Sequence, residues 1–273
     1  MVKLLVVLLF TSFILRADDL LYEKIESFIS ADSYEKNLSF IEIIFKDEAF
    51  FYRNERLDVV KIIQTLKENG LLKLSFSQPR HLKLAFRTNG SSLFFVKLMS
   101  DILRSIGYYR YLTEYSKSNS SEFIWQIGLD SEYITDPSVL RRELLKRGCD
   151  IVDIERKDDL TWSYTIDINE AHLGAVNILA NDEFVLKRAL TPHWLNVSTV
   201  ERLKLTSLGS NNWYPYITFF DAKLHLLRVY KRDSKTWQIK IKMPDDTQYV
   251  KVSDLYNLKN IKDGLKVEAL GQK

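Results

Sequence analysis

Ser33 and Lys36 have the S-x-x-K spacing of serine–lysine acyl-transfer enzymes, in which a lysine side chain lies beside the nucleophilic hydroxyl. Ser210-Asn211-Asn212 and Lys235-Thr236 follow in the order that those enzymes use. However, the segment around Ser33 is short and polar, and Trp237 stands where a glycine would let substrate approach the last strand. We therefore expect no serine–lysine chemistry in this chain.

The other residue types that do chemistry are sparse. None of the histidines has another histidine, a cysteine or a carboxylate at the spacing of metal ligands; they are His81, His172, His193 and His225. The one cysteine, Cys149, cannot form an internal disulfide, and we expect it to be a small buried side chain. The sequence thus predicts no catalytic residue, no metal ligand and no cofactor. A hydrolase whose site forms only in three dimensions stays an alternative.

Aromatic residues near the C-terminus give the strongest indication of binding. The candidate binding residues are Trp194, Trp213, Tyr214 and Tyr216. Exposed aromatic rings bind sugars or partner proteins, because a flat apolar face stacks without needing a charge. Adjacent rings at 213 and 214 must point to opposite sides of a strand. The alternative is core packing, which we expect for Trp237 because it alternates with Ile239 and Ile241.

Asn37 is a candidate for N-glycosylation. It begins an Asn-Leu-Ser sequon, and Glu35 precedes it by two residues. This pattern resembles the extended sequon that some bacterial periplasmic oligosaccharyltransferases use.

The first residues have the layout of a signal peptide. Lys3 precedes an apolar run from Leu4 to Leu15, and Arg16-Ala17 precedes two aspartates. The run has about a dozen residues, which as a helix rise roughly 18 Å and fall short of the roughly 30 Å hydrocarbon core of a membrane. We expect residues 1–17 to be a signal peptide cleaved after Ala17, and no stable membrane span after cleavage.

Composition indicates a folded protein without a bulk charge. Residues 18–273 contain 37 Lys and Arg and 36 Asp and Glu, so overall charge provides no attraction to nucleic acid. The chain is 46% hydrophobic and 12% aromatic, which is typical of globular proteins and not of disordered ones.

Periodicity predicts an α+β protein of three modules after the leader. Residues 18–77 form a small α+β module in which the apolar residues at 59, 62, 63 and 66 mark a helix ending at Asn69-Gly70. Residues 78–170 read as strand, helix, two strands, helix and strand, with one extra strand at the end, which is the ferredoxin-like order. Asp136-Pro137 starts the second of those helices. Residues 171–273 contain short alternating runs and predict a β-sandwich-like domain, with a small barrel as the alternative.

These features predict an exported, non-enzymatic binding or scaffold protein of the cell envelope, either periplasmic or secreted. The composition, rich in Lys, Ile, Tyr and Phe, looks like that of an AT-rich Gram-negative bacterium. The β-α-β-β order also resembles small modules of envelope assembly proteins, including polypeptide-transport-associated domains. We expect envelope or secreted protein partners, with a glycan as a second type of ligand. The alternative is a carbohydrate- or peptidoglycan-binding protein that uses the C-terminal aromatic residues.

Overall fold

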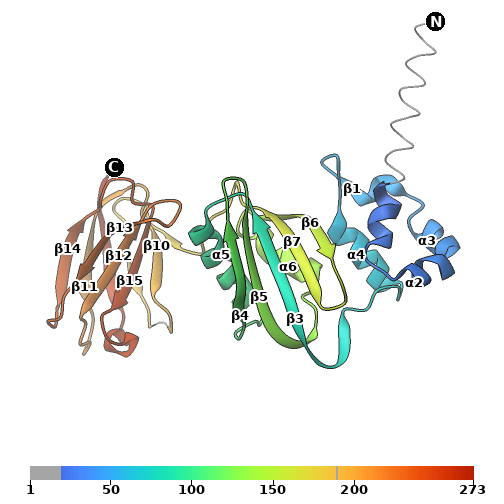
Figure 1. The fold of residues 1–273 in the computed structure, drawn as a ribbon. Coiled ribbons are helices and arrows are strands. Elements are labelled where there is room, and N and C mark those ends of the chain that lie inside the picture. Colours follow the sequence, from blue (N-terminus) through green and yellow to red (C-terminus); the bar gives the residue numbers. More distant parts are fainter. Residues whose placement is uncertain (1–19, 189) are drawn as a thin grey trace, which may run out of the picture. The chain divides into compact units, whose positions relative to one another are not determined.

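The computed structural model describes residues 20–188 and 190–273, so the expected signal peptide lies outside the described residues. The protein is of the α+β class, as the sequence predicted. It divides into two compact units, unit 1 (Met1–His172) and unit 2 (Leu173–Lys273), each of which is described by itself (Figure 1).

In the described part of unit 1, residues 20–26 are helical, and Leu21 and Ile25 among them are fully buried. Its other helices are α2 (Ala31–Lys36), α3 (Leu38–Ile44), η1 (Glu48–Phe51), α4 (Val59–Glu68), α5 (Ser92–Ser105) and α6 (Pro137–Leu145). Its strands are β1 (Tyr52–Arg53), β2 (Arg56–Leu57), β3 (Ser75–Thr88), β4 (Leu112–Ser118), β5 (Phe123–Tyr133), β6 (Asp150–Arg156) and β7 (Thr161–Asp167).

The five-stranded sheet of unit 1 has the order β4-β5-β3-β7-β6. The ferredoxin-like arrangement would place β6 beside β3, but β7 takes that position and runs parallel to β3. The short turn between β6 and β7 permits either strand to be the inner one. β7 buries Trp162, Tyr164 and Ile166 almost completely, whereas β6 carries several charged residues, which suit the edge of a sheet.

Of the predicted first module, residues 20–77 are continuous with the sheet that follows them. The expected boundary at 77/78 falls inside β3, whose register breaks between Ser75 and Arg80, around Pro79. Arg53 and Asp58 from the first segment also form ion pairs with Arg141 and Asp150 from the second. Residues 20–172 therefore share one compact unit.

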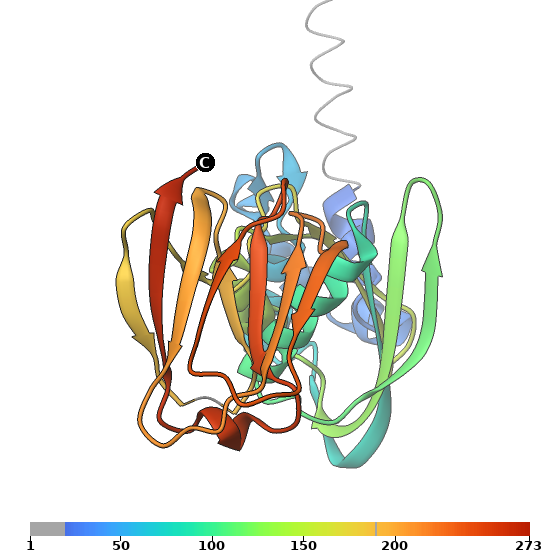
Figure 2. The same cartoon turned by 90° about the vertical axis from the view of Figure 1, so that its left-hand side faces the viewer.

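Unit 2 is a sandwich of two antiparallel-rich sheets (Figure 2). One sheet has the order β13 (Leu226–Lys231), β12 (Pro215–Phe220), β15 (Tyr249–Asp254), β10 (His193–Asn196) and β8 (Val176–Asn177). The other has the order β14 (Gln238–Lys242), β11 (Val200–Ser207), β16 (Leu265–Gln272) and β9 (Glu183–Leu186). A short helix, η2 (Leu258–Ile261), precedes β16. Residues from both sheets, including Phe219, Val250, Leu205 and Val267, fill one core between them.

Candidate functional site

Trp194 lies on the outer side of the five-stranded sheet of unit 2. Its neighbour Leu195 is fully buried in the sandwich core, and successive side chains on a strand point to opposite faces. Trp194 stands opposite Lys251 in the register of β10 and β15. Phe220, from β12, stacks on its indole with a centroid separation of 5.3 Å. The Lys251 Nζ lies 6.0 Å from the Trp194 ring centroid.

Tyr214 and Tyr216 also point to this outer side. They alternate with Trp213 and Ile217, both of which are buried in the core. Tyr216 lies opposite Ser253 on β15, in the row next to the one that holds Trp194. Three of the four predicted aromatic residues thus share one face of one sheet. We call Trp194, Tyr214, Tyr216, Phe220 and Tyr256 the aromatic face.

Tyr256 joins the aromatic face through a hydrogen-bonded loop. Its ring meets that of Tyr214 edge-on, with centroids 5.0 Å apart. The buried carboxylate of Asp254 accepts hydrogen bonds from the backbone N–H groups of Tyr214 at 2.7 Å and of Tyr256 and Asn257 at 2.9 Å each. The Asn260 amide donates to the same carboxylate at 3.0 Å. Asp254 therefore fixes the backbone that presents both tyrosines, and Tyr256 keeps 65% of its surface exposed.

Trp213 does not belong to a binding surface. Its side chain is fully buried, and its indole Nε1 donates to the Ser253 carbonyl oxygen at 3.1 Å. The expectation that adjacent rings at 213 and 214 point both ways is confirmed, and Trp213 is the inward one. For Trp237 the expected core position is wrong, because this residue precedes the first residue of β14 and is 64% exposed. Ile239 and Ile241 are buried as expected.

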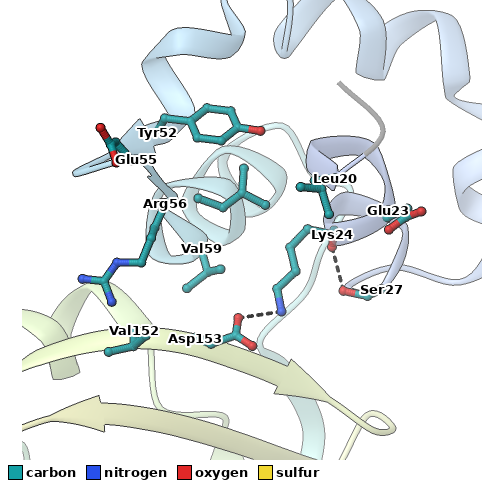
Figure 3. Close-up of a pocket in the computed structure, with 11 residues that line it drawn as sticks. Leu20, Glu23, Lys24, Ser27, Tyr52, Glu55, Arg56, Val59, Val152 and Asp153 are labelled. Carbon is teal, nitrogen blue, oxygen red and sulfur yellow. Dashed lines mark hydrogen bonds and ion pairs between the residues drawn. The ribbon is translucent and has the colours of Figure 1, made fainter. Parts of the chain in front are cut away.

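Unit 1 contains a hollow of about 500 Å³ (Figure 3). It lies between the helix over residues 20–26, the β1–β2 hairpin and β6. The hairpin turns at Asn54 and Glu55, whose φ values of 50° and 62° place both in the left-handed region. On one side of the hollow, Lys24 Nζ pairs with Asp153 at 2.6 Å. The described lining contains cations and carboxylates as well as apolar residues, an arrangement that can hold a polar ligand.

His81 lies between two carboxylates on unit 1, an arrangement that the sequence did not reveal. Its Nε2 lies 2.7 Å from Glu114 Oε1, and its Nδ1 lies 2.9 Å from Asp130 Oδ1. The hydrogen bond to Glu114, followed by that to Asp130, raises the pKa of His81, and the His81 contact lowers the pKa of Glu114. Gly128 leaves the space for this group, because a Cβ there would collide with Glu114 Oε1.

The chemistry available to this histidine is limited. A ring that donates from both nitrogens is an imidazolium, which has no free lone pair to act as a base. The partners come from 33 and 49 residues away, so no local spacing could have indicated them. His225 makes a second, local pair with Asp221 at 2.8 Å. The His81 contacts thus link three neighbouring strands at the surface, and the His225 contact holds a surface loop.

Cys149 is buried, as expected, and burial raises the pKa of its thiol to about 12. The proton therefore stays on sulfur at neutral pH, which disfavours thiol catalysis. Within residues 20–188 and 190–273, no group of three or more His, Cys, Asp or Glu side chains could hold a metal ion.

Asn37 lies at the junction of α2 and α3, where its side-chain amide donates to the Ser33 carbonyl oxygen at 2.8 Å. Glycosylation would leave one N–H on this amide, and the occupancy of Asn37 stays a prediction.

Among the described residues, no helix has the length and apolar character needed to cross a membrane. Comparison with protein-family models, with curated proteins and with solved structures finds no match for this chain.

Proposed function

We propose that this chain is an exported, non-enzymatic binding protein of the bacterial cell envelope, which holds a protein partner on the aromatic face of unit 2. The observation that supports this proposal is that Trp194, Tyr214 and Tyr216 lie outside a sandwich core that other side chains already fill. Aromatic residues are enriched at protein interfaces, because they bury a large area at a small cost in conformational entropy.

A protein partner fits the aromatic face better than a sugar. Stacking on a sugar ring needs an aromatic ring with an open flat face. Phe220 already covers one face of Trp194, and the ring of Tyr214 meets that of Tyr256 at an interplanar angle of 82°. Carbohydrate or peptidoglycan binding is the second candidate, and the 65% exposed ring of Tyr256 favours it.

A pair of variants of the full-length protein tests the binding role. Tyr256→Ala removes the most exposed ring of the aromatic face and leaves the Asp254 hydrogen bonds in place. Tyr109→Ala, in unit 1, removes a ring that is 74% exposed and serves as the control. We expect Tyr256→Ala, and not the control, to reduce the protein retained by an isolated envelope fraction. Equal retention of the two variants would contradict the role of the aromatic face. If Tyr256→Ala, but not the control, also binds less to purified peptidoglycan, the carbohydrate-binding alternative is favoured.

Export is tested separately. Native protein from the periplasmic or extracellular fraction should begin at Asp18 when its N-terminus is sequenced, because cleavage is expected after Ala17. Intact-mass analysis of the same sample would also show whether Asn37 carries a glycan. Native protein that is found in the cytosol and still begins at Met1 would contradict the export proposal.

A further inference from the structure

Two unpaired strand edges meet on one side of the sandwich. β13 ends the order of the five-stranded sheet and β14 ends that of the four-stranded sheet, and Figure 1 labels both. Within the described residues, β13 pairs only with β12, and β14 pairs only with β11. Arg228 Nη2 donates to the Lys242 carbonyl oxygen at 2.6 Å, so the two edges are neighbours. A strand edge presents backbone N–H and C=O groups that have no partner in their own sheet.

The segment that contains these edges carries the net charge of unit 2. The unit has sixteen Lys and Arg and ten Asp and Glu, and seven of the former but only one of the latter lie in residues 223–242. Six of the basic side chains make no ion pair among the described residues; they are Arg228, Lys231, Arg232, Lys235, Lys240 and Lys242. We call residues 223–242 the basic edge.

Apolar side chains are exposed among these charges. Leu226 is 58% exposed, Val229 is 39% exposed and Trp237 is 64% exposed. Charged residues on an edge strand usually prevent unwanted pairing, and a protective edge avoids large exposed apolar groups. Here both are present, and seven of the eight charged residues in this segment are basic. The combination therefore favours selective pairing with a negatively charged partner over simple protection.

We propose that β13 accepts an acidic, extended segment of a partner protein as an added strand. The regular pairing of Arg228–Lys231 with β12 holds these residues in strand conformation, so their outer backbone groups are ready to hydrogen-bond. The surrounding lysines and arginines attract the acidic side chains, and the exposed leucine and valine contact the apolar ones. This inference rests on the proposed binding function and names the chemistry of one partner segment.

The test uses full-length protein and a short, end-blocked peptide of alternating Glu and Val. We expect the peptide to bind, and amide hydrogen exchange in residues 226–231 to slow when it does. A copy of the peptide that is N-methylated at every residue keeps its charges but has no N–H donors. Strand addition requires that this copy fails to bind, whereas attraction of charge alone would let both peptides bind equally and would overturn the proposal.

Charge reversal locates the site. Lys240→Glu/Lys242→Glu should weaken binding by about tenfold or more, because it replaces two positive charges on β14, the edge next to β13, by negative charges that repel the acidic peptide. Lys259→Glu/Lys262→Glu makes the same change in charge at exposed positions near η2 and should bind as the parent does. Equal weakening in both double variants would overturn the assignment to the basic edge.

Two further outcomes separate this inference from its rivals. In the first outcome, the peptide does not bind, whereas vesicles containing phosphatidylglycerol bind the parent protein but not Lys240→Glu/Lys242→Glu. The basic edge then binds a membrane surface, and the proposal fails. If the peptide does not bind while envelope retention still depends on Tyr256, only the strand-addition inference fails. If the peptide does not bind and envelope retention does not depend on Tyr256, the proposed function fails as well.

Discussion

Trp213 shows how one residue can look functional in the sequence and be structural in the fold. It fills the centre of the sandwich, and its indole nitrogen is hydrogen-bonded inside the core. Trp213→Ala should therefore lower the free energy of unfolding by about 3–5 kcal/mol, as expected when a large core side chain is deleted. Trp237→Ala removes the same side chain from an exposed position and should change that free energy by less than about 0.5 kcal/mol. Urea unfolding curves of the two variants measure this difference, and similar losses would contradict it.

The pKa of His81 should lie above its ordinary value of 6.5, because two carboxylates accept hydrogen bonds from the charged ring. A raised pKa in the folded state means that this charge stabilises the protein below pH 6.5 and that the contribution is lost as the pH rises through the folded-state pKa. Titration of the His81 ring protons by NMR measures the value. Glu114→Gln should bring the pKa down more than Asp130→Asn, and an unchanged pKa in both would contradict the assigned hydrogen bonds.

The members of the aromatic face could be predicted only in part. Alternation along one strand separates Trp213 from Tyr214 and Tyr216, because inward and outward positions follow a period of two. Phe220 lies on the same strand as Tyr216, four residues further on, so the same alternation could have placed it on this face. Tyr256 could not be found in this way, since a loop that Asp254 organises brings it to the face. The His81 group was missed because its three members come from three different strands.

At the scale of elements, a network of two arginines and two aspartates joins the β1–β2 hairpin and α4 to the sheet. Arg141 pairs with Asp58 at 2.8 Å and with Asp150 at 3.2 Å, and Arg53 also contacts both aspartates. Arg141→Ala should lower the free energy of unfolding by about 2–3 kcal/mol, because Asp58 is mostly buried and would lose a charged partner. The adjacent, 65% exposed Arg142 is the control, and its replacement should cost less than about 0.5 kcal/mol. Thermal unfolding that does not distinguish the two variants would contradict this role.

The helices were more predictable than the sheet. α4 ends before Asn69-Gly70, and the Asp136 side chain caps α6 by accepting from Ser138 N–H, both as the sequence indicated. These features depend on local hydrogen bonds and on spacing within one helix. The position of β7 between β3 and β6 depends on a choice between two strands that share a short turn. Burial in the folded sheet decides which of the two strands is the inner one, so a local sequence pattern cannot predict it.

At the scale of the molecule, unit 2 has what it needs to fold alone. Among its described residues, nineteen buried side chains form the core, and all of them come from residues 178–269. We expect a protein made of residues 173–273 to unfold cooperatively and to give a dispersed amide spectrum by NMR, because this core is formed by residues of the unit itself. A collapsed spectrum or a broad, non-cooperative transition would contradict this independence.

The single thiol of the chain provides a way to follow these experiments. Cys149 is enclosed, and the pKa of about 12 makes it unreactive toward maleimide dyes while the protein is native. A cysteine introduced at an exposed position can therefore be labelled selectively without first removing the natural one. The slow rate at which Cys149 itself is labelled would then measure the rate or frequency of local unfolding of unit 1 around this residue.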